Sequence, residues 1–272
     1  MTDRRETSSL SDQEVSAYVS RLVAEGRNHF VIEDIRSSIE LPWKSVRSAL
    51  RELKDRREIA EPFRDFYVIV RPACRPIGCL PPEEFVPGLM AYWGEYYYLS
   101  LLSAAEFHGA AHHRPQTFQV MYARETRTVV CGNVRIQLIK RNHLERMPVA
   151  APGEIHETIR VASPETTAFE IVGYPHLCAG IDNVATVLAE LAEVLDASRL
   201  VSVAGFCPTS WAQRLGFLLD LVEQKSVAEP LAAYVQSKSR RFVPLLAKSS
   251  DVSGPRDRRW NVLVNAVVES DV

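Results

Sequence analysis

Residues 43–70 read WKSVRSALRELKDRREIAEPFRDFYVIV, and this stretch decides the fold of the N-terminal part. Its first half, residues 43–57, predicts a helix because apolar side chains recur on one face at helical spacing. These side chains are Val46, Ala49, Leu50 and Leu53. The second half predicts two strands, 59–61 and 66–70, around a turn that contains Pro62, Arg64 and Asp65.

Two further helices are expected upstream of this stretch. Ser11 and Glu14 have the spacing of a capping box, and the apolar residues that follow fall on one helical face. Ile32, Ile35 and Ile39 suggest a second short helix that ends near residues 40–42, because the residue before Pro42 is pushed out of the helical region. Three helices followed by a hairpin is the element order of a winged helix-turn-helix.

Beyond this domain, prolines in residues 71–94 predict a linker. We expect a winged helix-turn-helix domain at 1–75, a proline-rich linker at 76–95 and a larger domain at 96–272. The predicted fold class is mixed α/β.

The larger domain has a mixed pattern of helices and strands. Residues 96–108 are apolar almost all round and predict a buried central helix, with Gly109 as its C-cap. Ser163 and Pro164 are typical of a helix start. Other expected strands are 117–122, 128–131, 134–139, 157–161 and 260–268, and other expected helices are 163–171, 183–195, 210–222 and 227–237.

Composition describes an ordinary globular chain of 272 residues with a net charge of −2, 46% hydrophobic and 24% charged residues. No apolar run approaches the roughly 18–20 residues that span a bilayer, and the polar N-terminus does not resemble a secretory signal. The five cysteines have no zinc-finger spacing and are read as reduced thiols. We therefore expect a cytoplasmic protein without membrane contact.

The opposite face of the predicted helix 43–57 is basic, with six Lys or Arg against two acidic residues. In helix-turn-helix docking such a helix enters the major groove, where long cationic side chains suit guanine. Arg47 and Arg51 are the base-reading candidates, Ser45 and Ser48 suit phosphate contacts, and Arg64 in the wing can reach a phosphate or the minor groove. The alternative is that this is the solvated face of an amphipathic helix.

Other chemistry is less well supported by the sequence. His108, His112 and His113 invite a metal site, but Gly109 interrupts the helix and no Cys or Asp lies nearby, so packed or loop histidines are favoured. A magnesium nuclease lacks close acidic pairs, and no GxSxG, GxGxxG or Walker motif is present. We expect no catalytic residues, no metal and no cofactor.

A second basic region lies near the C-terminus. It is compatible with a solvated loop, a second DNA-facing surface or a dock for an acidic protein, and the sequence does not choose among these. Its basic residues are Lys238, Arg240, Arg241, Lys248, Arg256, Arg258 and Arg259.

Together with the N-terminal pattern, four segments resemble the AbiEi family, the antitoxin and regulator of bacterial abortive-infection (AbiE, type IV) toxin–antitoxin systems. They are YYYLSLLSAAEFHGAAHHRPQTFQV (96–120), VASPETTAFEIV (161–172), WAQRLGFLLD (211–220) and RDRRWNVLVN (256–265). Each segment is unspecific alone, but their order and spacing across the chain are specific.

The resemblance implies an autorepressor that binds inverted repeats at its own promoter and a C-terminal domain that neutralises a nucleotidyltransferase-like toxin without requiring a stable complex. Only Lys44, Ser45, Arg47, Ser48 and Arg51 match a functional location, the recognition helix. Residues 1–71 hold 13 basic and 13 acidic side chains, so the non-specific affinity of one copy for DNA should be modest. Binding of two copies to two half-sites then becomes more important for affinity. Two alternatives stay open: a winged-helix transcription factor with a ligand-sensing domain, and a DNA-tethered nuclease.

Overall fold

The computed structural model describes residues 3–110, 115–150, 153, 159–247 and 253–269, with side-chain environments from residue 12 onward. The chain divides into two compact units. The first unit comprises Met1–Tyr96 and Arg124–Ile139, and the second comprises Tyr97–Ala123 and Lys140–Val272. The mixed α/β class expected from the sequence is confirmed.

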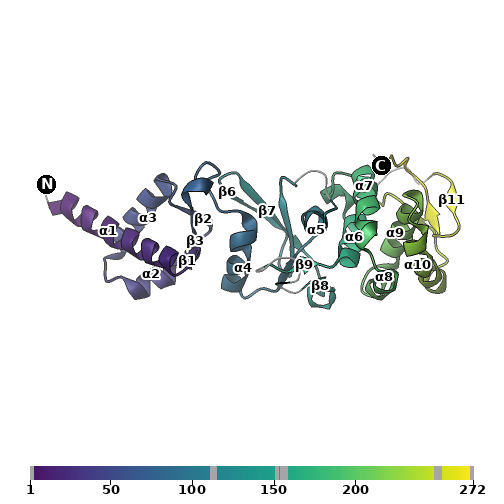
Figure 1. The fold of residues 1–272 in the computed structure, drawn as a ribbon, viewed down its shortest axis with the longest axis horizontal. Coiled ribbons are helices and arrows are strands. Elements are labelled where there is room, and N and C mark those ends of the chain that lie inside the picture. Colours follow the sequence, from purple (N-terminus) through teal and green to yellow (C-terminus); the bar gives the residue numbers. More distant parts are fainter. Residues whose placement is uncertain (1–2, 111–114, 151–152, 154–158, 248–252, 270–272) are drawn as a thin grey trace. The chain divides into compact units, whose positions relative to one another are not determined.

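The N-terminal part of the first unit has the predicted order of three helices and a hairpin (Figure 1). Its elements are α1 (Asp3–Ala24), β1 (His29–Val31), α2 (Ile32–Ser38), α3 (Trp43–Asp55), β2 (Ile59–Phe63) and β3 (Phe66–Ile69). Helix α1 begins before the expected Ser11 cap, and strand β1 was not predicted. This strand pairs antiparallel with β3, which gives the sheet order β1-β3-β2.

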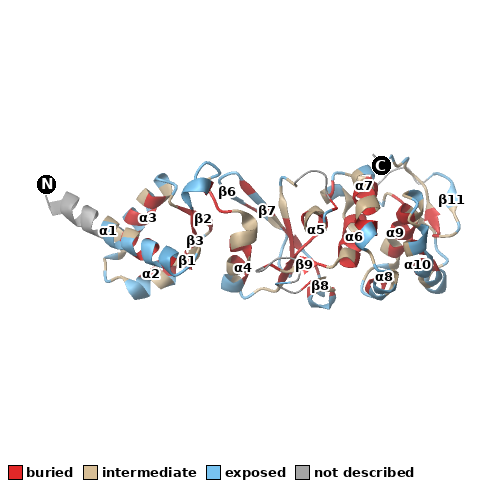
Figure 2. Ribbon diagram, viewed as in Figure 1, coloured by how far each residue is buried: buried red, intermediate tan, exposed pale blue. Residues whose placement is uncertain are grey.

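One apolar core joins these elements. The buried faces of α1 and α3 pack together, and Val15, Leu22, Leu50 and Leu53 belong to the same cluster (Figure 2). Phe30 of β1 stacks on the ring of Tyr67 of β3, with 5.2 Å between the ring centroids. Burial of the apolar stripe therefore fixes which face of α3 is turned outward.

The predicted linker at residues 76–95 contains a packed helix, α4 (Pro82–Trp93), preceded by a 3₁₀ turn at Pro72–Cys74. Proline at the first helical position is compatible with a helix start. Phe85 and Leu89 are completely buried at a spacing of four residues, and the ring of Trp93 lies edge-on to Phe63 of β2. Pro82 starts this helix and Pro87 lies inside it, so the stretch expected to be a proline-rich linker contains a packed helix.

The hairpin of β6 (Arg127–Cys131) and β7 (Val134–Lys140) forms as predicted, with Gly132 and Asn133 at its turn. Residues 124–139 belong to the first unit, which the sequence analysis did not anticipate. The backbone N–H of Asn133 donates to the carbonyl of Ile77 at 2.8 Å, and a Cβ at Gly132 would collide with that carbonyl. Glycine at position 132, with φ +56°, permits this close approach.

In the second unit, the expected helix over 96–108 is wrong in its first half. Tyr97–Leu99 forms strand β4, and helix α5 covers only Leu101–Phe107. An apolar run that is buried on all sides fits a central strand as well as a helix, so periodicity cannot separate the two. Strand β4 pairs antiparallel with β5 (Phe118–Tyr122) and parallel with β9 (Val161–Ala162), which pairs with β8 (Val149–Ala150). The capping role expected of Gly109 fits its φ of +78°.

The rest of the second unit is mainly helical (Figure 1). Its helices are α6 (Pro164–Gly173), α7 (Ile181–Leu191), α8 (Ala197–Ala204), α9 (Thr209–Leu221) and α10 (Lys225–Lys238), and its short closing strands are β10 (Val243–Pro244), β11 (Arg256–Asp257) and β12 (Val262–Leu263). The side chain of Ser163 caps α6 by accepting from the N–H of Thr166, as predicted. Helix α8 was not predicted, and the terminal strand is shorter than expected. Residues 157 and 158 of the expected strand 157–161 lie outside the described residues, and of the remaining three only Val161 belongs to a strand, β9.

The closing segment docks on α9, which explains why the WAQRLGFLLD and RDRRWNVLVN segments occur together. The buried indole of Trp260 donates to Asp220 at 2.7 Å. Its ring occupies the space beside Gly216 that a side chain would fill. The amide of Gln213 reaches the carbonyls of Trp260 and Asn261.

No helix among the described residues is long and apolar enough to cross a membrane.

Candidate nucleic-acid interface

The six basic side chains of the helix 43–57 region separate into two groups. Three are engaged with the protein's own groups: Lys54 with Glu61 at 2.5 Å, Arg56 with Glu58 at 3.0 Å, and Arg57 with the carbonyl of Arg75 at 3.3 Å. The other three, Lys44, Arg47 and Arg51, are exposed and form no ion pair with any described residue. These three are therefore available to an external anion.

The three available cations share one side of α3. At about 100° per residue, Lys44, Arg47, Ser48 and Arg51 fall within an arc of roughly 100° around the helix axis. That arc is centred opposite the buried Val46, Ala49, Leu50 and Leu53. We call Lys44, Arg47, Ser48 and Arg51 the exposed basic face of α3. Ser45, the fifth predicted contact, is half-buried at the edge of this face.

Trp43 connects α2 to this face. Its half-buried ring packs against the core, with the guanidinium of Arg36 4.3 Å and that of Arg47 5.1 Å from the ring centroid. Cation–π contact restricts Arg47 before any ligand binds. Arg36 and Trp43 were not among the residues predicted from the sequence, although an aromatic residue at the first turn of the basic helix was a usable signal.

Acidic residues limit the face toward its C-terminal end. Asp55 is exposed on the same side as Lys44. Glu52 lies at the flank that faces α1, where a hydrogen bond with Asp12 raises the pKa of its carboxyl group. The positive charge is therefore concentrated on the first two and a half turns of α3, the part that enters the major groove in helix-turn-helix docking.

The predicted wing is a tight hairpin with Arg64 at its tip. Phe63 pairs with Phe66, which leaves only Arg64 and Asp65 in the loop, and Pro62 is buried in an irregular part of β2 outside this turn. The N–H of Ile32 donates to the carbonyl of Asp65 at 3.0 Å. The Arg64 side chain is 86% exposed and forms an ion pair with the adjacent Asp65 at 3.4 Å. The wing thus offers a single cation on a fixed support.

The C-terminal basic region has a different character. Arg259 forms ion pairs with Asp220 at 3.2 Å and with Glu229 at 2.5 Å, so it fastens the closing segment to α9 and α10. Arg240, Arg241, Arg256 and Arg258 are exposed, and the guanidinium of Arg256 lies over the ring of Phe242. These four arginines stand on irregular chain and short strands, whereas the exposed basic face of α3 stands on one helix. Lys248 lies outside the described residues.

A buried polar cluster in the second unit was not anticipated from sequence. Glu170 of α6 is fully buried, accepts a hydrogen bond from Tyr98 at 2.6 Å and pairs with Arg141 at 3.3 Å. Burial raises the pKa of Glu170 to about 7, against the pull of the Arg141 charge. The Arg141 guanidinium also lies 5.5 Å from the ring of Trp211. Because the cluster is enclosed, we interpret it as structural.

The histidine cluster supplies no site among the described residues. His108 is half-buried at the end of α5, where its Nε2 lies 2.7 Å from the carbonyl of Ala162, as a packed histidine does. Burial lowers the pKa of His108. His112 and His113 lie outside the described residues. Within the described part of the chain, no three His, Cys, Asp or Glu residues are grouped so that they could hold a metal ion.

Comparison with family models gives a match in the C-terminal part of the chain. Residues 98–221 match the family model described as the AbiEi antitoxin C-terminal domain. The resemblance stated from the sequence is thereby confirmed.

Among solved structures, the crystal structure of the RV2827C protein from Mycobacterium tuberculosis matches with a TM-score of 0.68 and 16% identity. The match covers 94% of this chain and 91% of that one. At this identity the likeness concerns the fold. No curated protein sequence matches the chain.

Proposed function

We propose that this protein is the antitoxin of a type IV toxin–antitoxin system and the DNA-binding autorepressor of its own operon. The antitoxin part rests on the AbiEi domain at residues 98–221. The DNA-binding part rests on the element order of the first unit, which is that of a winged helix-turn-helix, and on the exposed basic face of α3. The partner is a nucleotidyltransferase-like toxin, and the action is non-enzymatic and cytoplasmic.

The observation that best supports DNA binding is that the basic side chains of the helix 43–57 region fall into two groups, one paired with the protein's own groups and one unpaired among the described residues. Lys54 and Arg56 are paired with acidic side chains, so these two cations offer little net charge to an external anion. Lys44, Arg47 and Arg51 instead point away from the core with no ion-pair partner among the described residues. In this arrangement Arg47 and Arg51 read bases, Lys44, Ser45 and Ser48 contact phosphates or neighbouring base edges, and Arg64 touches the flanking backbone.

We further propose that two copies bind one operator. Basic and acidic residues balance over residues 1–71, so non-specific attraction to DNA from one copy is weak. Two copies on an inverted repeat double the number of contacts. We propose residues 1–75 as the DNA-binding part and residues 96–272 as the antitoxin part. These ranges differ from the two compact units, because α4 and the β6–β7 hairpin belong to the first unit.

The experiment has two arms. Gel shift with the DNA directly upstream of the chain's own reading frame should give a specific complex that scrambled competitor of equal length does not remove. Co-expression with the product of the adjacent reading frame should restore growth that this product alone stops. A chain that cleaves the DNA in magnesium, or that binds neither DNA nor protects cells, contradicts the proposal.

A further inference from the structure

A pair of buried thiols lies where two distant segments of the first unit meet. Gly78 and Gly132 approach so closely that a Cβ on Gly78 would lie 3.2 Å from the Cα of Gly132. Cys79 follows the first glycine and Cys131 precedes the second. The hydrogen bond from Asn133 to Ile77 holds the two segments in this register.

The two sulfur atoms interact directly. The thiol of Cys79 donates a hydrogen bond to the sulfur of Cys131, which lowers the pKa of Cys131, and the backbone N–H of Glu61 donates to the same sulfur. The same contact, together with burial, raises the pKa of Cys79. The pKa of Cys131 is therefore shifted down and that of Cys79 is shifted up, so Cys131 is the more readily deprotonated thiol of the pair.

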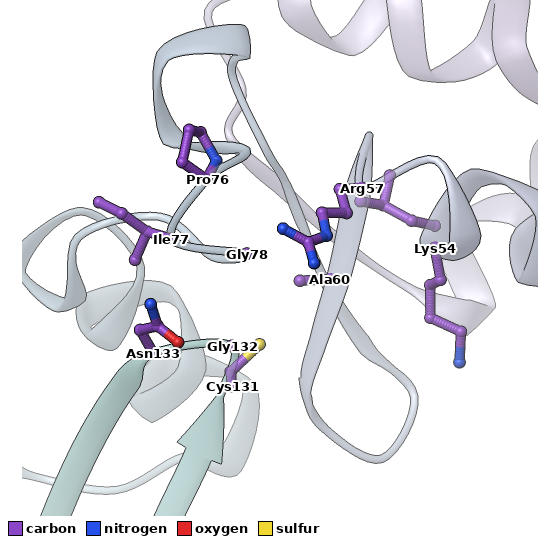
Figure 3. Close-up of a pocket in the computed structure, with 10 residues that line it drawn as sticks. Lys54, Arg57, Ala60, Pro76, Ile77, Gly78, Cys131, Gly132 and Asn133 are labelled. Carbon is purple, nitrogen blue, oxygen red and sulfur yellow. The ribbon is translucent and has the colours of Figure 1, made fainter.

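A surface pocket gives access to Cys131. The pocket has a volume of about 300 Å³ and is lined by residues of α3, β2, the 76–78 segment and the β6–β7 turn (Figure 3). The sulfur of Cys131 and the guanidinium of Arg57 both lie at this pocket, whereas the Lys54 amine points away from it (Figure 3). Cys131 is 8% exposed, but Cys79 is completely buried and does not line the pocket. A small polar oxidant can therefore reach Cys131 first.

We propose that Cys131 and Cys79 form a peroxide-sensitive dithiol, with Cys131 as the attacking thiol and Cys79 as the resolving thiol. The Cys131 thiolate attacks one oxygen of hydrogen peroxide, the O–O bond breaks, and hydroxide leaves and takes up a proton to form water. The sulfur of Cys79 then attacks the resulting sulfenic acid, which forms the S–S bond and releases a second water. Both thiols are oxidised, and one peroxide is reduced to two waters.

Oxidation at this place affects the exposed basic face through Glu61. Disulfide formation withdraws the Cys131 sulfur from the N–H of Glu61. The Glu61 carboxylate holds Lys54 of α3 and also accepts the N–H of Asp65 at the hairpin turn, at 3.2 Å. Loss of this support alters both parts of the proposed DNA surface, a consequence that rests on the proposed function. We expect oxidation to weaken operator binding by about tenfold, the effect of roughly one lost contact.

The chemical step is tested on the full-length reduced protein with equimolar hydrogen peroxide, followed by alkylation, proteolysis and mass spectrometry. The expected product is a cross-linked peptide of Cys79 and Cys131 in the wild type and in Cys74→Ser. Cys74 is the matched control because it is similarly buried, at 7% exposure, in the same unit. In Cys79→Ser, Cys131 should accumulate as a sulfenic acid that dimedone traps.

Cys207 provides the exposure control. It is more exposed than Cys131, but burial raises the pKa of its thiol to about 11, so Cys131 should react about tenfold faster. Faster oxidation of Cys207, or a cross-link through Cys74, overturns the assignment. Complete alkylation of both Cys79 and Cys131 after peroxide also overturns it.

The DNA arm compares reduced and oxidised wild type with Cys79→Ser on the upstream duplex. Binding by the reduced wild type tests the proposed function independently of any disulfide. A cross-linked protein that binds DNA as tightly as the reduced one overturns the link through Glu61 while leaving the dithiol in place.

Discussion

The arginines of the first and second units are placed in opposite ways. On α3, Arg47 and Arg51 are exposed and lack ion-pair partners among the described residues, so their charges contribute little to folding. In the second unit, Arg141 is almost completely buried against Glu170, and Arg259 is fixed by two carboxylates. Charge removal should therefore impair binding without unfolding in the first unit and unfold the protein in the second.

The largest expected effect follows from removing Glu170. Arg141 cannot lose its proton, so Glu170→Ala leaves a buried cation unpaired and also removes the acceptor of Tyr98. We expect a loss of about 3–5 kcal/mol in the free energy of unfolding. Urea unfolding followed by tryptophan fluorescence measures it, because Trp211 lies beside Arg141.

The control is Glu95→Ala, which removes the partner of the exposed Arg124 and should cost about 1 kcal/mol or less. Equal losses in the two variants would contradict the distinction between buried and exposed charges.

A smaller effect is expected for Arg141→Met. Methionine fills much of the same volume, and the buried Glu170 can take up a proton once its partner is gone. We expect a loss of about 1–2 kcal/mol in the same urea experiment. A loss larger than that of Glu170→Ala would show that the cluster depends on the cation more than on the carboxylate.

Stability should also depend on pH through Glu170. Its pKa is raised from 4.5 to about 7 by burial. A raised pKa in the folded state means that the folded protein favours the protonated carboxyl group. Glu170 therefore stabilises the folded state fully below the unfolded-state pKa, and this stabilisation is lost as pH rises through about 7. We expect the free energy of unfolding to fall by on the order of 1–3 kcal/mol between about pH 5 and pH 8. Glu170→Gln should flatten this slope, and an equally steep slope in that variant would assign it to another group.

The smallest effect on stability is expected for Arg64→Ala. The side chain of Arg64 is largely exposed and its ion pair is with the adjacent Asp65, so the free energy of unfolding should be unchanged within about 0.5 kcal/mol. On DNA, removal of one phosphate contact should weaken binding evenly across sequences and reduce the salt slope by about 1. An altered base preference would instead place Arg64 in a groove.

The sequence predicted the helices and strands of residues 32–70 well because local signals agree there. The apolar stripe of α3, the proline at 42 and the β-prone 66–70 segment each indicate the observed element. Strand β1 was missed because three residues carry no periodicity, and it forms only by pairing with β3.

In other parts of the chain, tertiary contacts determine which secondary structure forms. Tyr97–Leu99 is a strand because it pairs with β5 and β9, and this pairing cannot be read from the apolar segment alone. Helix α4 could have been recognised from the paired spacings of Phe85 with Leu89 and Val86 with Met90, which the prolines obscured. The candidate contacts on α3 were predictable from charge and periodicity. The separation of free from engaged cations was not, because it depends on the positions of Glu58, Glu61 and the Arg75 carbonyl.

The central claim is that the exposed basic face of α3 binds DNA. The most direct test is a binding isotherm of the Arg47→Ala/Arg51→Ala double variant on the upstream duplex at fixed salt, beside Arg56→Ala, which removes an engaged cation of the same helix region. We predict a loss of about 1–3 kcal/mol for each base-reading arginine, an unchanged melting temperature, and near-wild-type affinity in the control. Wild-type affinity in the double variant, or an equal loss in Arg56→Ala, would contradict the claim.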